Sequence, residues 1–329
     1  SSAIVYTAQA LRQKQGATAP INTFTAAFPG KEGDESEFVR HIEQDLGLNA
    51  TYCNPFEEFS FEDFERFLKI QDMPVGHTSV YAQWSVMRLV GDSPVTVLLD
   101  GQGGDELFGG YHHHMYKMGR DLMLKGRFRK LNRLVAEFCE LKGMDPKLVK
   151  KYIRDDVKLY FKLKMGKKLP GPPEATTWNA ARSLSDVLRL DILSWIMPKL
   201  LRHEDRNSMA YGLEARLPFL DYRIVEFAMT LPDDFKIHKG WQKYILRQAM
   251  PDLPEKIRFR KDKKGFTTPH NEWMARYRKR FLELAEIAAE AGVKLPGTAK
   301  NVAELGELHL FRVANLGLLI RSSDDLVMA

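Results

Sequence analysis

The stretch that decides the fold is VTVLLDGQGGDELFGGY, residues 95–111. It opens with apolar and β-branched residues, Val95–Leu99, which predict a strand buried on both faces. The run ends at Asp100, and a glycine-rich turn follows before Asp105 and Glu106 lead into a helical turn. A strand that ends in a glycine turn and reopens as a helix exposes backbone N–H groups at the carboxyl edge of a sheet. Anionic ligands bind at that edge in open α/β sheets.

The acidic pair in this stretch has two interpretations. Asp105 and Glu106 can hold a divalent cation against phosphate oxygens. They can equally favour the start of a helix after a tight turn, without any ligand. The residues alone leave both interpretations open.

Composition excludes several classes of protein. The chain has 329 residues, with 44% hydrophobic and 28% charged residues, which is typical of a globular protein with a substantial core. No apolar run is long enough to cross a membrane, so we expect no membrane association. The two cysteines, Cys53 and Cys139, are far apart, which excludes a disulfide framework and predicts a cytoplasmic protein.

The net charge of +6 is concentrated in three basic runs, at 125–130, 162–168 and 258–264. Such runs are usually solvated helix faces or loops. The alternatives are a polyanionic partner or a local field that attracts nucleotide phosphates.

Strands and helices alternate up to Tyr111. Helices are predicted near 1–15, 36–46, 56–68 and 80–89, and strands at 21–28, 50–53 and 95–99. The aromatic residues of the third helix are expected to form core. After Tyr111 the strand signal disappears and helical patterns follow, at 115–141, 146–165, 184–197, 222–229, 241–249, 272–291 and 305–320. We therefore predict an α/β fold, with a doubly wound parallel sheet in residues 1–111 and a mainly helical part in residues 112–329.

Several separated motifs carry a resemblance to a known family. They are DGQGGDELFGGY (100–111), LLRHEDRNSMAYGLEARLPFLD (200–221), GWQKYILR (240–247) and LPEKIRFRKDKKGFTTP (253–269). In this order they resemble the synthetase half of the glutamine-dependent asparagine synthetases, which are PP-loop ATP pyrophosphatases with an adenine nucleotide α-hydrolase-like fold. The resemblance covers essentially the whole chain.

The chain also departs from the family pattern. The family's first phosphate loop has the form SGGxDSS, and Ser1 and Ser2 match only its last two residues. We therefore expect the rest of that loop, its strand and an N-terminal glutaminase domain to precede this chain, and we expect the 329 residues to be inactive alone. Gln102 stands where many members carry Glu; Gln keeps a hydrogen bond but cannot take a proton.

The resemblance implies an ATP-dependent ligase. Aspartate is activated as β-aspartyl-AMP with release of pyrophosphate, and ammonia from the glutaminase domain displaces AMP to give asparagine. The implied substrates are ATP, aspartate and ammonia, the cofactor is Mg²⁺, a homodimer is an open option, and nucleic acid is not expected. The ATP-binding residues implied are Ser1, Ser2, Ala26, Asp100, Gly101, Asp105 and Lys243; the catalytic ones are Gln102, Lys243, Arg206 and Glu214; the magnesium ligands are Asp105 and Glu106.

Several of these residues have a structural alternative. Lys243 and Arg247 are four apart, so a helix would point both the same way. Arg206 lies in a charged run that could be a solvated ion-pair cluster. Glu214 and Arg216 could form a buried pair that orients the site or a purely structural pair. Adjacent histidines at 112–114 do not share one helix face, which argues against a metal site.

Three other functions stay open. A related adenylating enzyme of the β-lactam-forming type would use another carboxylate and amine. A PP-loop enzyme that modifies tRNA would use the basic runs as phosphate contacts. A non-catalytic scaffold would need no complete phosphate loop.

Overall fold

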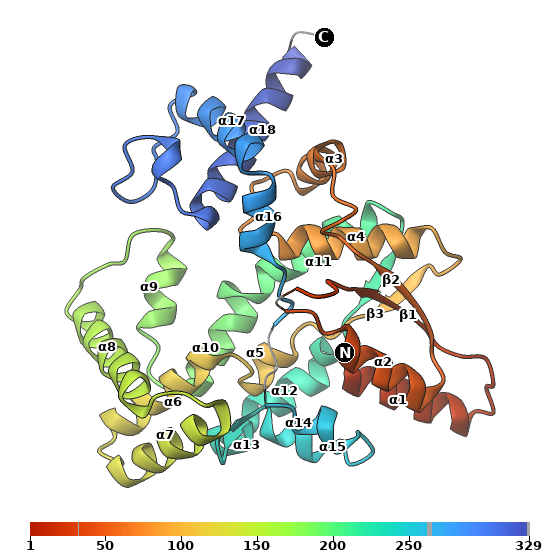
Figure 1. Cartoon of the computed structure of the whole chain (residues 1–329). Coiled ribbons are helices and arrows are strands. Elements are labelled where there is room, and N and C mark those ends of the chain that lie inside the picture. The colour runs from red at the N-terminus through yellow and green to blue at the C-terminus, as the bar shows by residue number, and fades with distance from the viewer. Residues whose placement is uncertain (32, 262–264, 328–329) are drawn as a thin grey trace. The chain divides into compact units, whose positions relative to one another are not determined.

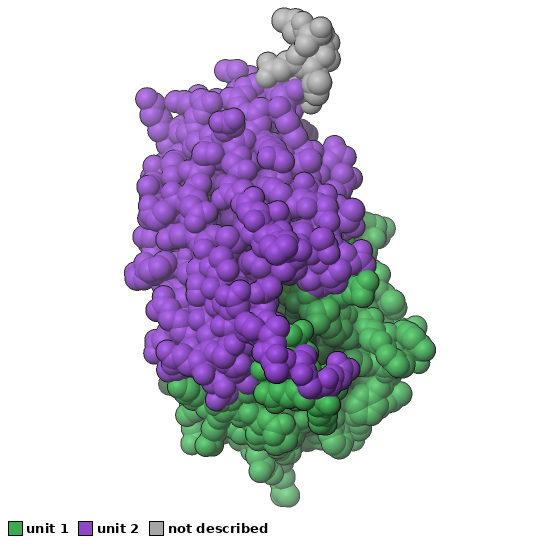
Figure 2. All heavy atoms as spheres, turned by 90° about the vertical axis from the view of Figure 1, so that its right-hand side faces the viewer, with its two compact units in different colours: residues 1–14, 99–202, 216–263 green, residues 15–98, 203–215, 264–329 purple. Residues whose placement is uncertain are grey.

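The structure is a computed structural model that describes residues 1–31, 33–261 and 265–327. The chain forms two compact units, each built from segments that are distant in the sequence (Figure 2). Unit 1 comprises residues 1–14, 99–202 and 216–263, and unit 2 comprises residues 15–98, 203–215 and 264–329. These units differ from the predicted division of the chain into residues 1–111 and 112–329. That division stays a prediction.

Unit 1 is almost entirely helical. Its core joins α6, α7 and α8, which lie together in Figure 1, through buried residues such as Met115, Leu134 and Ile153. A π-helical turn, Asp191–Trp195, lies between α10 (Leu184–Leu190) and α11 (Met197–Met209). The helices are α1 (Ser2–Lys14), α5 (Gly104–Phe108), α6 (His112–Leu124), α7 (Phe128–Lys142), α8 (Pro146–Lys164), α9 (Pro173–Asn179), α10 (Leu184–Leu190), α12 (Tyr222–Thr230), α13 (Asp233–Lys236), α14 (Tyr244–Gln248) and α15 (Glu255–Arg258).

Unit 2 combines a parallel strand pair with helices. Strands β1 (Asn22–Ala26) and β2 (Asn49–Cys53) pair in parallel, with Asn22 opposite Asn49, and α2 is their crossover. The helices are α2 (Ser36–Leu46), α3 (Phe61–Gln71), α4 (Ser79–Gly91), α16 (His270–Arg276), α17 (Arg278–Glu290) and α18 (Glu307–Val327). Helix α11 (Met197–Met209) and strands β3 (Val97–Leu99) and β4 (Glu214–Arg216) contain the boundaries between the units.

The aromatic residues near the start of the chain form core, which confirms the prediction for residues 56–68. Phe64, Phe67 and Trp84 are at most 1% exposed and pack in one cluster with Trp273 and Phe311. Helix α3 begins at a Ser60 cap, whose hydroxyl accepts a hydrogen bond from the Asp63 N–H at 3.1 Å. The local cap therefore fixes where this helix starts, and its apolar face supplies the core of unit 2.

Three predicted helices are interrupted in the structure. Residues 115–141 form α6 and α7, separated at Gly126, which has a left-handed φ of 65°. Residues 272–291 form α16 and α17, with Tyr277 between them. Residues 241–249 begin as β6 (Trp241–Gln242), which pairs antiparallel with β5 (Ile237–His238), and only then become α14. The break at Gly126 is local, whereas the pairing of β6 with β5 overrides the helical pattern at residues 241–249.

The strand at residues 95–99 differs from its prediction. Strand β3 is three residues long, and Val97 and Leu99 are 45% and 53% exposed, so burial on both faces was wrong. Its hydrogen-bonded neighbour among the described strands is β4, with the Asp100 N–H donating to the Arg216 carbonyl at 3.0 Å. The described strands form three two-stranded sheets, so the fold they establish is mainly helical with small sheets.

None of the helices in the described part of the chain combines the length and the apolar character that a membrane span requires.

Helix α17 packs closely against α18 through Gly317. A Cβ at Gly317 would stand 1.7 Å from the carbonyl oxygen of Leu284, so the backbones must separate if any side chain is added. Gly317→Ala should lower the free energy of unfolding by at least about 2 kcal/mol in urea denaturation. The gain in helix propensity, about 1 kcal/mol, is too small to offset this clash.

Gly306→Ala is the matched control, because its added Cβ would meet nothing within 4 Å. Equal loss of stability in the two variants would show that the close approach of α17 and α18 is not limiting.

Candidate functional site

The glycine-rich turn after β3 is packed against two other segments of unit 1. A Cβ on Gly101 would lie 2.5 Å from the backbone nitrogen of Ser1, and a Cβ on Gly103 would lie 2.5 Å from the side chain of Leu220. Gly103 also has a left-handed φ of 89°. The turn therefore needs glycine at both positions, and the backbone of Ser1 lies beside Gly101.

The carboxylate of Asp105 and the ammonium of Lys243 form an ion pair at 2.7 Å. The side chains are 25% and 13% exposed, so the pair is accessible but not fully hydrated. Both side chains lie over Gly110, where a Cβ would be 1.7 Å from Oδ1 of Asp105 and 2.5 Å from Cε of Lys243. The structure thus brings together two predicted site residues that are far apart in the sequence.

The four-residue spacing predicted that Lys243 and Arg247 share one face of a helix, and this prediction was wrong. Lys243 is the N-cap of α14 with a left-handed φ of 52°, and its N–H donates to the carbonyl of Phe108 at 3.2 Å. Arg247 instead donates from Nε to the carbonyl of Gln242 at 2.9 Å and lies 4.9 Å from the ring centroid of Trp241. Arg247 therefore holds the backbone around the site.

Glu106 has a different environment from its neighbour Asp105. Glu106 is 1% exposed, and its Oε1 accepts a hydrogen bond from the hydroxyl of Tyr111 at 2.5 Å. Burial raises the pKa of the Glu106 carboxyl, and the Tyr111 hydrogen bond opposes part of that rise. Of the two predicted magnesium ligands, Asp105 fits better, because its carboxylate is the accessible one; Gln102, on the same turn, is half-buried.

A buried acid–imidazole cluster lies at the start of α6, and no sequence motif predicted it. Nε2 of His114 lies 2.8 Å from Oδ2 of Asp191, and the Trp178 indole donates to Oδ1 of Asp191 at 2.6 Å. Nδ1 of His114 accepts from the Tyr111 N–H at 3.3 Å, so the Nε2 proton points at Asp191. Burial raises the pKa of Asp191 to about 6 and lowers that of His114 to about 3.

His113 completes this cluster. The potential ligand atoms of His113, His114 and Asp191 lie within 4.8 Å of one another. Both nitrogens of His114 are already used in hydrogen bonds, so its lone pair is not directed at a metal ion. The cluster is therefore a buried hydrogen-bonded assembly, which the sequence could not reveal because Asp191 belongs to a separate π-helical turn.

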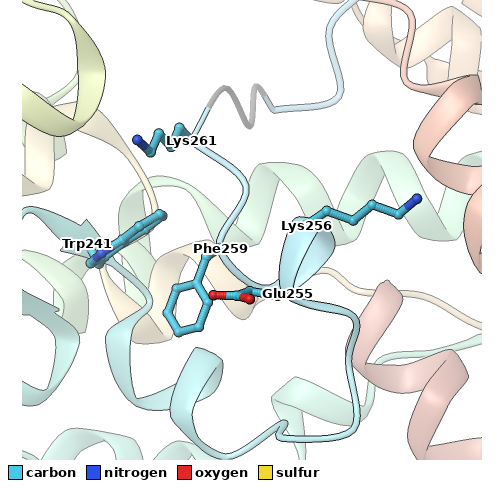
Figure 3. Close-up of a pocket in the computed structure, with 5 residues that line it drawn as sticks. All are labelled: Trp241, Glu255, Lys256, Phe259 and Lys261. Atoms are coloured by element: carbon cyan, nitrogen blue, oxygen red, sulfur yellow. The ribbon is translucent and has the colours of Figure 1, made fainter.

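A hollow in unit 1 lies beside the basic run at 258–264 (Figure 3). Its volume is about 790 Å³, and Trp241 and Phe259 meet there edge to face, with ring centroids 5.3 Å apart. Lys256 and Lys261 also line it, and the ammonium of Lys256 points away from the two rings. Residues 262–264 of the predicted basic run lie outside the described residues.

Three predicted site residues belong to unit 2. Ala26 ends β1 opposite Cys53. Arg206 donates from Nη1 to the carbonyl of Ile70 at 3.4 Å. Glu214 lies in β4, and it is exposed, as is Arg216, so the proposal of a buried Glu214–Arg216 pair was wrong. The short strand β4 presents both side chains to solvent.

His113→Phe would keep the ring contacts to Tyr111 and Trp178, at 5.3 and 5.2 Å, and remove a buried nitrogen, Nε2, that has no hydrogen-bond partner among the described residues. Burial lowers the pKa of His113 to about 3. In the unfolded chain His113 binds a proton below about pH 6.5, whereas in the folded chain it does so only near pH 3. The free energy of unfolding therefore falls as the pH drops from about 6.5 toward 3. Between pH 7 and pH 5 the variant should gain about 2 kcal/mol relative to the unmodified protein in urea unfolding.

His238→Phe is the control, because it keeps that side chain's ring contact with Tyr244. Parallel pH profiles for His113→Phe and the unmodified protein would contradict the prediction.

Comparisons with known proteins place the chain in a family. A family model described as asparagine synthase matches residues 1–305. Asparagine synthetase [glutamine-hydrolyzing] 1 of Bacillus subtilis is 29% identical over 291 residues, which cover 77% of this chain and 43% of that protein. Asparagine synthetase [glutamine-hydrolyzing] 3 of the same organism is 27% identical over 293 residues, covering 83% and 44%.

A third relative, the asparagine synthetase [glutamine-hydrolyzing] of Gallus gallus, is 37% identical over 97 residues, 28% of this chain and 16% of that protein. The chain spans less than half of the length of these relatives. Since the family model matches nearly the whole chain, the chain belongs to the asparagine synthase family.

Proposed function

We propose that the protein is an ATP-dependent amide ligase that makes asparagine. The side-chain carboxylate of aspartate attacks the α-phosphorus of ATP, so pyrophosphate leaves and β-aspartyl-AMP forms. Ammonia then attacks the activated carbonyl carbon, and AMP leaves. The observation that carries this proposal is the Asp105–Lys243 pair beside the glycine-rich turn and Ser1.

The pair suits a site that receives a highly charged nucleotide. The first step brings an anionic carboxylate to an anionic triphosphate, so it needs fixed positive charge and fixed geometry more than a covalent nucleophile. Lys243 is partly shielded from water and held by the backbone contact to Phe108, which fits a group that neutralises departing pyrophosphate. Ser1, Ser2, Asp100 and Gly101 would contact the nucleotide from the turn and the start of α1.

The remaining assignments follow from the family motifs. Ala26 would read the adenine through its backbone at the end of β1. Arg206 and Glu214 would act on phosphate charge and site geometry, and Gln102 would position ammonia by a hydrogen bond. Support for the roles of Arg206, Glu214 and Gln102 comes from the motifs at 200–221 and 100–111 in which they lie.

The accessible carboxylate of Asp105 fits a single protein ligand to Mg²⁺, which commonly uses one or two carboxylates together with phosphate oxygens. The ion would supply additional positive charge to the phosphates. Glu106 would act mainly through its bond to Tyr111, which holds the start of α5 in place.

The sheet, the ammonia source, the location and the oligomeric state of the protein belong to the same proposal. The parallel β1–β2 pair with its α2 crossover supports a doubly wound parallel sheet. The relatives are named glutamine-hydrolyzing, which supports glutamine as the ammonia source, in a glutaminase domain of the same protein. A cytoplasmic location and a homodimer are compatible with it.

Lys243→Met should reduce aspartate-dependent ATP–pyrophosphate exchange by about 10²–10³-fold in the full natural protein, because it removes a preorganised positive charge. Lys243→Arg keeps the charge but must fit a larger head group over Gly110, so a smaller loss is expected. Asp105→Asn should mainly raise the Mg²⁺ concentration needed for half-maximal exchange.

Lys279→Met, an exposed position on α17, is the control and should leave exchange unchanged. Exchange that proceeds equally without Lys243 would refute the assignment. Exchange that depends on a carboxylate other than aspartate would favour the β-lactam-forming type of reaction.

A further inference from the structure

The positive charge of the chain is concentrated on one part of unit 1. Residues 125–168 contain fifteen Lys and Arg against five Asp and Glu, so this segment carries +10 while the whole chain carries +6. It forms α7, α8 and their connections. The rest of the chain therefore has a net negative charge, and this segment presents a distinct electrostatic surface.

A groove runs along this surface between α7 and α8. Its volume is about 270 Å³, and its apolar part includes Phe128, Leu131 and Ile153. Three cations, Lys147, Lys150 and Arg154, line its edge. They recur three and four residues apart on α8, which places them on one side of the helix.

The cations at this edge differ from others nearby. Within residues 1–31, 33–261 and 265–327, Lys147, Lys150 and Arg154 form no ion pair, whereas Arg133 pairs with Glu137 and Lys158 with Asp155. Phe128 is 57% exposed at the entrance. The groove therefore combines uncompensated positive charge with apolar surface in contact with water.

We propose that this groove binds an acidic peptide segment of a partner protein. An apolar side chain of the segment occupies the space beside Phe128, and flanking carboxylates pair with Lys147, Lys150 and Arg154. The groove is smaller than the roughly 300–1,000 Å³ of typical small-molecule sites, so it admits one or two side chains rather than a larger ligand. Its floor is largely aliphatic, whereas single-stranded nucleic acid needs aromatic platforms for its bases.

The charge requirement is tested with the full natural protein and a fluorescein-labelled peptide in which glutamates flank two leucines. Fluorescence anisotropy should show binding that weakens with added salt. Lys150→Glu with Arg154→Glu should weaken binding at least about tenfold. Lys162→Glu with Lys164→Glu makes the same change in net charge on exposed positions of α8 that do not line the groove, and it should change binding less than about twofold.

The apolar requirement has its own matched pair. Phe128→Ala should weaken peptide binding about fivefold, whereas Phe161→Ala, which is 52% exposed on α8 outside the groove, should not. A peptide with serine in place of leucine should bind more weakly by a similar factor. Unchanged thermal midpoints would show that all four variants fold.

Three outcomes would overturn the proposal: equal weakening by the two double variants, equal binding of the leucine and serine peptides, or binding of single-stranded RNA or anionic vesicles in place of the peptide. None of these outcomes bears on asparagine formation, so the two proposals fail separately.

Discussion

The ion pair between Asp105 and Lys243 is the contact on which the site depends. It joins the start of α5, the Gly109–Gly110 turn and the junction between β6 and α14. The backbone accommodates it at a cost, because Lys243 adopts a left-handed conformation that costs a non-glycine residue about 1–3 kcal/mol. The N–H bond to Phe108 and the absence of a side chain at Gly110 keep this geometry in place.

Behind the pair, the protein buries titratable groups that are linked to one another. The hydroxyl of Tyr111 binds Glu106, its N–H binds His114, and His114 binds Asp191. Burial favours the neutral form of each of the three titratable partners, since it raises the pKa of the carboxyls and lowers that of the imidazole. Asp105 and Lys243, by contrast, form an ion pair whose side chains remain partly exposed to solvent. In the proposed reaction this arrangement would supply the fixed cation that the leaving pyrophosphate needs.

Part of the fold and of the site could be predicted from the sequence. The glycine turn, the aromatic core of α3 and most helices are local features, set by cap residues such as Ser60 and by apolar periodicity. The interruptions could not be predicted in this way. The pattern at 241–249 predicts a helix, yet its first two residues form β6, the second strand of the β5–β6 hairpin, because they pair with residues 237–238. The same limit applies to β3, whose apolar residues indicate burial although two of them are exposed.

The sequence by itself determined the membership of the family and the position of the glycine-rich turn after β3, because both depend on residue types at short spacing. Glycine is needed at positions 101, 103 and 110 because the backbone there lies too close to Ser1, to Leu220 and to the Asp105–Lys243 pair to leave room for a side chain. Only the tertiary structure decided that Lys243 reaches Asp105, that Glu106 turns to Tyr111 and that Asp191 meets His114. These contacts join segments that are distant in the chain or side chains whose direction is set by packing, and local sequence carries no information about either.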